Sequence, residues 1–380
     1  MQEEPVRKGA STAVLATSLY RSLAADRENL FFSPYSISAA LAMCHAGASG
    51  ATREEIEAAL GRRGEGDRLI EAFGDLQQVL ASRARPAPKP FHLSIASSLW
   101  CQTGYPVNPA FMETLRNQLG ADVKETDFAG APTEAVRDVN LWVNEATRGK
   151  IREILFESQL DALTRVILAN AIYFKAPWLN QFDEEDTKPE PFRLLDGRRV
   201  DVPLMHATEY HRYARGRRFQ ALEVPYGNER VVMLLLLPDE GQFEAVEREL
   251  DVGSVVELTR SVNSVEVALA LPRFRVESSL NLCEALTRIG IKGAFAPGDF
   301  TRVSTEPGFA LGDVLHKAVV DVDERGTEAA AVTAMVMLGA AARKPPRPIE
   351  FRVDRPFLFL IEDKPTGTIL FLGRVLDPSG

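Results

Sequence analysis

Hydrophobic residues in the first part of the chain recur at the three- and four-residue spacing of amphipathic helices. This spacing predicts helices over residues 10–25, 33–47, 52–60, 67–80, 109–119 and 133–147. Capping signals support two of these starts. Ser33 followed by Pro34 fits a helix N-terminus, and Thr52 with Glu55 has the spacing of a capping box.

Strand patterns lie between these helices and dominate the rest of the chain. They cover residues 93–100, 165–174, 220–224, 231–237, 265–271, 314–322, 357–361 and 369–375. Several of these runs are apolar throughout, as expected for sheets that are covered on both faces. Helices followed by mainly antiparallel strands, without repeats or a break in composition, predict one α+β domain over residues 1–380.

One segment near the C-terminal end fits neither pattern. Residues 326–346 read GTEAAAVTAMVMLGAAARKPP, and residues 329–342 include no charge, proline or large aromatic side chain. In a strand, alternate residues from Thr327 to Met337 would share one side that is small near its start and uncharged. A segment that enters a sheet must avoid buried charge, whereas a solvated loop has no such constraint. The segment is either a strand intended for a sheet or an ordinary apolar linker or helix, since alanine also favours helix.

Insertion of this segment into a sheet would release a large free energy. About fifteen residues span roughly 50 Å as a strand. At ~1 kcal/mol net per backbone hydrogen bond, the gain is on the order of 10 kcal/mol. This is comparable to the whole stability of a typical domain. A fold that keeps the segment outside the sheet would therefore be metastable, and cutting the segment would let it relax.

The composition is that of a globular protein, with 45% hydrophobic and 26% charged residues among 380. A formal net charge of −9 disfavours nucleic acid as a partner, and no run approaches the roughly twenty apolar residues of a membrane span. The start of the chain lacks a signal-peptide core, so we expect either a cytoplasmic protein or one whose secretion signal was removed. Cys44, Cys101 and Cys283 lie in apolar sequence and are expected to be buried thiols.

No specific catalytic or metal-binding motif is present in the sequence. The five histidines are His45, His92, His206, His211 and His316, and none stands at a metal-ligand spacing from another histidine or cysteine. There is no G-x-S-x-G motif and no phosphate-binding loop. We therefore expect no catalytic residue, no metal site, no cofactor and no enzymatic activity.

Several stretches match, in order and spacing, the motifs of one known protein family. They begin with NLFFSPYSISAALAMCHAGASGATREEI (29–56), VNLWVNEATRGKI (139–151) and ILANAIYFKAPWLNQF (167–182). They continue with ALEVPYGNERVVMLLLLP, VALALPRFRVE, LHKAVVDVDERGTEAAAVTA and RPFLFLIEDKPTGTILFLGRVLDP. On these motifs, the chain resembles the serpin family of serine protease inhibitors from about Ala10 to Pro378.

The resemblance implies an α+β serpin fold with three β-sheets, about nine helices and an exposed reactive-centre loop near residues 325–348. It also implies a monomer that presents this loop as bait to a target serine protease. The protease forms an acyl-enzyme with the loop, which inserts into the central sheet as a new strand and distorts the captured enzyme. Such a mechanism would explain the small, uncharged segment.

The resemblance assigns roles to particular residues. The hinge, where insertion begins, is matched by Glu324, Gly326, Thr327, Glu328, Ala329, Ala330, Ala331, Val332 and Thr333. Trp178 matches the tryptophan of the breach, which is the end of the central sheet where the loop enters. Ser33, Ser36, Asn170 and His316 match the shutter, a polar cluster beneath the strands that must part. Two residues depart from the pattern: Ala176 replaces a glycine before Pro177, which puts the backbone there in doubt, and Val332 is bulkier than usual, which predicts slower insertion.

Counting from Glu324 as in inhibitory family members gives Ala340–Ala341 as the cleaved bond. An alanine there favours elastase-like or subtilisin-like proteases with small primary pockets. The alternatives are cleavage after Ala341 or Ala342, and cleavage of the bond Arg343–Lys344, which would attract trypsin-like enzymes. The competing function is a non-inhibitory serpin that acts as a carrier, another binding protein or a chaperone.

Overall fold

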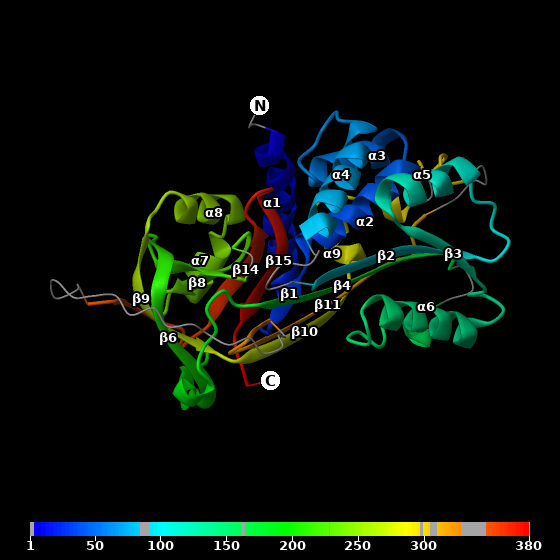
Figure 1. Ribbon diagram of the computed structural model, residues 1–380. Coiled ribbons are helices and arrows are strands. Elements are labelled where there is room, and N and C mark those ends of the chain that lie inside the picture. Colours follow the sequence, from blue (N-terminus) through cyan, green and yellow to red (C-terminus); the bar gives the residue numbers. More distant parts are fainter. Residues whose placement is uncertain are drawn as a thin grey trace.

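The computed structural model describes residues 4–83, 92–160, 164–227, 229–296, 299–304, 310–327 and 347–379. Over these ranges the chain forms nine α-helices and fifteen strands (Figure 1). The helices are α1 (Glu4–Leu23), α2 (Pro34–Gly47), α3 (Gly50–Ala59), α4 (Arg68–Arg83), α5 (Pro109–Leu119), α6 (Pro132–Ala146), α7 (Phe243–Arg248), α8 (Val252–Arg260) and α9 (Cys283–Arg288). The strands are β1 (Leu30–Phe32), β2 (His92–Gln102), β3 (Asp122–Thr126), β4 (Val166–Pro177), β5 (Lys188–Arg193), β6 (Arg199–Arg215), β7 (Phe219–Pro225), β8 (Val231–Pro238), β9 (Ser264–Pro272), β10 (Phe274–Asn281), β11 (Asp313–Asp323), β12 (Gly326–Thr327), β13 (Ile349–Arg352), β14 (Phe357–Asp363) and β15 (Thr368–Val375).

The central sheet has the strand order β10-β11-β12-β4-β2-β3. β4 and β11 pair in parallel from Ile167 and Asp313 to Tyr173 and Val319. Further along they separate, and the two residues of β12 lie between them, antiparallel to both. β4 is buried along nearly its whole length, which explains why most of its residues are apolar.

The other strands form two sheets that share the long strand β6. One contains β1, β15, β14, β8 and β7, which β6 joins through residues 213–215. The other contains β5, β9 and β13 around residues 199–212 of β6. The expectation of an α+β serpin fold with three sheets and about nine helices is confirmed.

Helices cover both faces of the central sheet. In Figure 1, α6 lies on one side of β2, β4 and β11, and α2 and α5 lie on the other. Trp142 and Val143 of α6 pack with Trp100 of β2 in one hydrophobic cluster. None of the described helices combines the length and the apolar character needed to cross a membrane.

Most predicted elements are present, and their errors have physical causes. The capping box is wrong, because α3 begins after Ser49 and the Glu55 carboxylate accepts backbone N–H bonds from Lys292 and Gly293 instead. Missing from the prediction were β1, β3, β5, β6, β10, β12 and the short helices α7, α8 and α9. β13 was also not predicted, and it belongs to a different sheet from β14, which follows it in the chain. Cys44 and Cys101 are buried as expected, whereas Cys283 is half-buried.

Candidate functional site

The described part of the chain brings the expected site residues into two places on the central sheet. Ser33, Ser36, Asn170 and His316 meet beneath β4 and β11. Trp178, Glu324, Gly326 and Thr327 meet where those strands separate. Glu328, Ala329, Ala330, Ala331, Val332 and Thr333 of the hinge lie outside the described residues, and so do Ala340, Ala341, Ala342, Arg343 and Lys344.

The shutter is a closed network of hydrogen bonds at the N-terminus of α2. Ser33 caps this helix: its Oγ accepts from the Ser36 backbone N–H at 3.0 Å and donates to the Leu370 carbonyl at 2.6 Å. Ser36 Oγ donates to Asn170 Oδ1 at 2.6 Å. Asn170 Nδ2 donates to the Ser36 carbonyl at 3.1 Å and to Ser97 Oγ at 2.9 Å. The network therefore ties α2 to β4 and β2, and through Leu370 to β15.

His316 joins β11 to the same network, and its tautomer follows from its partners. The Ser33 backbone N–H donates to Nε2 at 3.1 Å, so Nε2 must be unprotonated. Nδ1 then carries the proton and donates to Asn170 Oδ1 at 2.8 Å. Complete burial lowers the pKa of His316 from 6.5 to about 3, which keeps the ring neutral. A neutral, fully paired ring lets β4 and β11 pack over α2 without a buried charge.

Two residues of the expected hinge are paired within the central sheet. Gly326 and Thr327 pair with Pro177 and Ala176 of β4 and with Asp323 and Val322 of β11. Thr327 is fully buried. Residues 326 and 327, within the expected reactive-centre loop near 325–348, are thus part of β12.

Gly326 is required by the shape of this junction. Its φ of +144° lies in a region that L-residues rarely adopt. A Cβ atom there would lie 2.2 Å from the carbonyl oxygen of Ala176 and 2.6 Å from Cα of Pro177. The doubt over Ala176 and Pro177 is thus resolved: β4 continues through both, and the glycine across from them makes room.

A stacked pair of aromatic rings holds the buried end of the hinge. Trp178 and Tyr226 stack with centroids 4.5 Å apart and an interplanar angle of 12°. The Tyr226 hydroxyl lies 2.8 Å from Thr327 Oγ1, and Trp178 Nε1 donates to the Asp323 carbonyl at 2.9 Å. Together these contacts fix the turn between β11 and β12 at the breach.

Glu324 anchors the same turn from outside the strands. Its carboxylate accepts from Arg273 Nε at 2.6 Å and from Thr187 Oγ1 at 2.5 Å. Burial raises the pKa of Glu324, but the bonds from Arg273 and Thr187 outweigh burial and leave the pKa below its usual value. The ionised carboxylate therefore ties the turn to Thr187, just before β5, and to Arg273, between β9 and β10, at neutral pH.

Five residues of the shutter and the breach were not predicted from the sequence. They are Ser97 and Leu370 at the shutter and Tyr226, Thr187 and Arg273 at the breach. Tyr226 and Thr327 are 101 positions apart, so no local pattern could have linked them. Within the described ranges, no three His, Cys, Asp or Glu side chains are grouped so that they could hold a metal ion.

Comparison with known proteins identifies the family. A model of the family Serpin (serine protease inhibitor) matches residues 10–378. The chain belongs to the serpin family. It is 40% identical over 377 residues to an uncharacterized serpin-like protein of Thermococcus kodakarensis, which covers 99% of this chain and 87% of that protein.

A named inhibitor and a binding protein are also similar to this serpin. The leukocyte elastase inhibitor of Bos taurus is 37% identical over 360 residues, covering 92% of this chain and 93% of the relative. A crystal structure of human thyroxine-binding globulin with thyroxine aligns with a TM-score of 0.87 and 29% identity, covering 99% of this chain and all of that one. Serpins act as protease inhibitors rather than as catalytic enzymes, but the globulin shows that the same fold also serves as a binding protein.

Proposed function

We propose that this serpin is a monomeric, single-domain inhibitor that traps a serine protease as a covalent acyl-enzyme while its reactive-centre loop inserts into the central sheet. The observation that carries the proposal is β12, since the hinge already occupies the first two positions of the inserted strand. No new pairing has to be nucleated after cleavage. Only the direct pairing of β4 with β11 has to open.

β12 also supplies the register for the rest of the insertion. The pairings of β12 with β4 and with β11 can be continued one residue at a time. Each later residue then falls between one residue of β4 and one of β11 that are paired with each other in this structure. In this register, Thr333 enters between His316 and Asn170, at the shutter. Odd-numbered hinge residues follow Thr327 to the core side of the sheet, where small side chains avoid overpacking.

Insertion replaces one strand interface with two. The pairs broken run from Ile167 and Asp313 to Tyr173 and Val319. Each is replaced by a pairing of the new strand with β4 and another with β11, at ~1 kcal/mol net per hydrogen bond gained. The His316–Asn170 hydrogen bond also has to yield, so the shutter controls how fast the sheet opens.

For the target, we propose an elastase-like or subtilisin-like protease that cleaves at Ala340–Ala341. A small primary pocket accepts an alanine. The similarity to a leukocyte elastase inhibitor supports the same class. Cleavage after Ala342 or Arg343 remains the alternative, and Arg343 would direct the inhibitor to trypsin-like enzymes.

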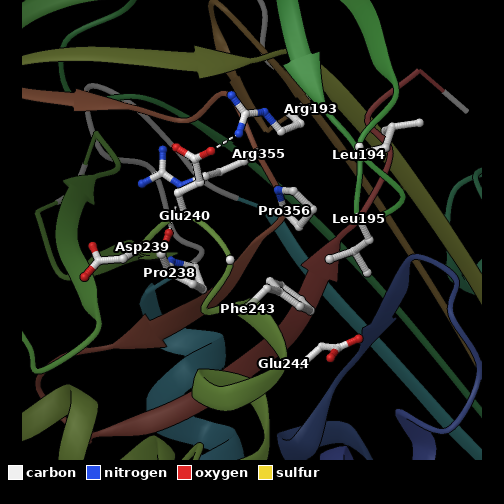
Figure 2. Close-up of a pocket in the computed structure, with 12 residues that line it drawn as sticks. Arg193, Leu194, Leu195, Pro238, Asp239, Glu240, Phe243, Glu244, Arg355 and Pro356 are labelled. Carbon is white, nitrogen blue, oxygen red and sulfur yellow. Dashed lines mark hydrogen bonds and ion pairs between the residues drawn. The ribbon is translucent and has the colours of Figure 1, made fainter.

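A carrier function is the second candidate, since thyroxine-binding globulin has a similar structure. Figure 2 shows a cavity of about 350 Å³ where β8 leads into α7. Its charged groups are engaged within the protein: Arg193 pairs with Glu240, and Arg355 Nε donates to the Pro238 carbonyl at 2.8 Å. Such a cavity offers a ligand few unpaired polar groups with which to form hydrogen bonds. It therefore does not favour a carrier function over protease inhibition.

The deciding experiment incubates the protein with elastase-like, subtilisin-like and trypsin-like proteases. We expect an SDS-stable adduct with the elastase-like or the subtilisin-like protease. We also expect a released C-terminal peptide whose mass shows that its first residue is Ala341. Complete cleavage without any adduct would instead favour the non-inhibitory function.

A further inference from the structure

A cavity of about 550 Å³ lies where the C-terminal end of α1 meets α7 and the end of β15. Four arginines and two glutamates are among the residues that line it, and none of its lining residues belongs to the shutter, the breach or the hinge. We call it the arginine cavity. Its volume lies within the range that is typical of small-molecule sites.

Two of the four arginines are engaged within the protein. Arg374 is 3% exposed, forms an ion pair with Glu247 at 2.6 Å and donates to three backbone carbonyls within residues 24–28. Arg27 forms an ion pair with Glu244 at 2.7 Å. These two pairs balance both glutamates of the cavity.

The other two arginines, Arg21 and Arg248, have no carboxylate partner in the described part of the chain. Arg21 Nη2 donates to the Leu250 carbonyl at 3.0 Å, and Arg248 forms neither an ion pair nor a hydrogen bond with any described residue. Glu249, which directly follows Arg248, pairs with Arg218 instead. The lining of the cavity therefore retains two positive charges that no lining carboxylate balances.

The structure brings these two charges to one junction between helices. The Tyr20 hydroxyl donates to Glu247 Oε1 at 2.6 Å, so the residues directly before Arg21 and Arg248 are bonded to each other. Burial and the Glu247 carboxylate raise the pKa of Tyr20 well above its usual value, which keeps the phenol a neutral donor. Two positive charges at one junction repel each other, and an anion bound between them would remove that repulsion.

The remaining walls of the cavity are largely apolar. Phe243, Leu195 and Leu376 line it beside the charged groups. Each guanidinium presents a planar fork that binds two oxygens of a carboxylate or phosphate group through parallel N–H bonds. Apolar walls next to two such forks fit a carbon skeleton that carries negative charge.

We propose that the arginine cavity binds a small organic dianion, either a dicarboxylate or a phosphate monoester. Arg21 and Arg248 hold its acidic groups, and Phe243 packs against its carbon skeleton. The proposal does not depend on the proposed inhibitory function. Because β15 belongs to a sheet that stays closed in that mechanism, the ligand stabilises the fold without competing with loop insertion.

The competing explanation is that these arginines only complement a helix dipole. Arg21 lies in the last turn of α1 and Arg248 in the last turn of α7, where a positive charge is favourable without any ligand. Arg116 provides the matched control, since it is an exposed arginine in the last turn of α5 and does not line the cavity.

The test uses the full-length protein and its variants Arg248→Gln, Arg21→Gln and Arg116→Gln. Isothermal titration calorimetry measures the binding of succinate as the dicarboxylate, glycerol phosphate as the phosphate monoester and acetate as a monoanion, all at equal ionic strength set with sodium chloride. Melting temperatures without ligand establish that each variant folds. Arg21→Gln also loses the bond to Leu250, so Arg248→Gln decides if that variant is unstable.

We expect succinate or glycerol phosphate to bind the parent protein with a dissociation constant of about 1 mM, and acetate to bind at least about tenfold more weakly. Arg248→Gln and Arg21→Gln should each weaken the binding of that dianion about tenfold, and Arg116→Gln should stay within about twofold of the parent. The probe that binds tells which of the two acids the cavity takes. Absence of binding by both dianions, or equal binding by the parent and Arg248→Gln, would overturn the proposal.

Discussion

His316 is a single side chain that joins the two strands that separate in the proposed mechanism. Both of its ring nitrogens are used, Nε2 as an acceptor from Ser33 and Nδ1–H as a donor to Asn170. A charged side chain at position 316 would carry the desolvation cost of a buried charge whenever the strands close over it. A neutral imidazole avoids that cost as long as it stays unprotonated.

Acid should therefore weaken the native state through His316. Its pKa is about 3 in the fold and 6.5 without burial, so between these values the unfolded chain binds a proton that the native state does not. The free energy of unfolding should fall by up to about 1.4 kcal/mol per pH unit from this residue as the pH drops through that window. Urea titrations at several pH values would measure the slope.

The matched variant for that measurement is His316→Gln, which retains one acceptor and one donor but does not titrate. The unfolding free energy of this variant should depend less on pH than that of the parent. The difference in slope corresponds to at most one proton taken up on unfolding. Identical slopes for the two proteins would contradict the assignment of a neutral, proton-poor His316.

At the scale of elements, the smallest strand has the largest consequence. β12 contains two residues, yet it lies between the ends of β4 and β11 and, in the proposed mechanism, sets the register of the strand that inserts. It is held by the Tyr226–Thr327 contact, by Glu324 and by the close approach that Gly326 allows. The hinge is consequently a docked strand end rather than a free linker.

Thr327→Arg should undock this strand end. Thr327 is fully buried against Tyr226, and burying a guanidinium without a partner costs several kcal/mol. Insertion would then stall, and the protease would hydrolyse the acyl-enzyme before it is trapped. We expect cleaved product in place of SDS-stable adduct on denaturing gels.

Thr327→Ser is the control, because it retains the hydroxyl that meets Tyr226 and adds no charge. It should trap protease with nearly the parent stoichiometry. If Thr327→Arg formed as much adduct as this control, insertion through β12 would not be the trapping mechanism.

At the scale of the whole molecule, the sequence predicted elements well where burial was continuous. β4, β8 and β14 are mostly apolar because nearly all of their residues are buried. β6 was missed because its polar and apolar residues alternate irregularly as it passes from one sheet to another. The short helices α7 and α9 give too few turns for a periodic pattern.

The site was predictable only in part, and for a related reason. Ser33 and Ser36 are far in sequence from Asn170 and from His316, so the family resemblance, not spacing, placed these residues together. Tyr226, Thr187 and Arg273 carried no signal of their own, since each acts by touching the hinge from a different element. That β12 is already inserted could not be read from residues 326–327, because the same sequence would suit an undocked loop.

The central claim is that the uncleaved protein is metastable, with β4 and β11 waiting to admit the rest of the hinge strand. The most direct measurement is the melting temperature before and after a single cut near Ala340. Insertion worth on the order of 10 kcal/mol should raise the melting temperature of a chain of this length by roughly 12 °C. A melting temperature that stays the same or falls after the cut would contradict the account.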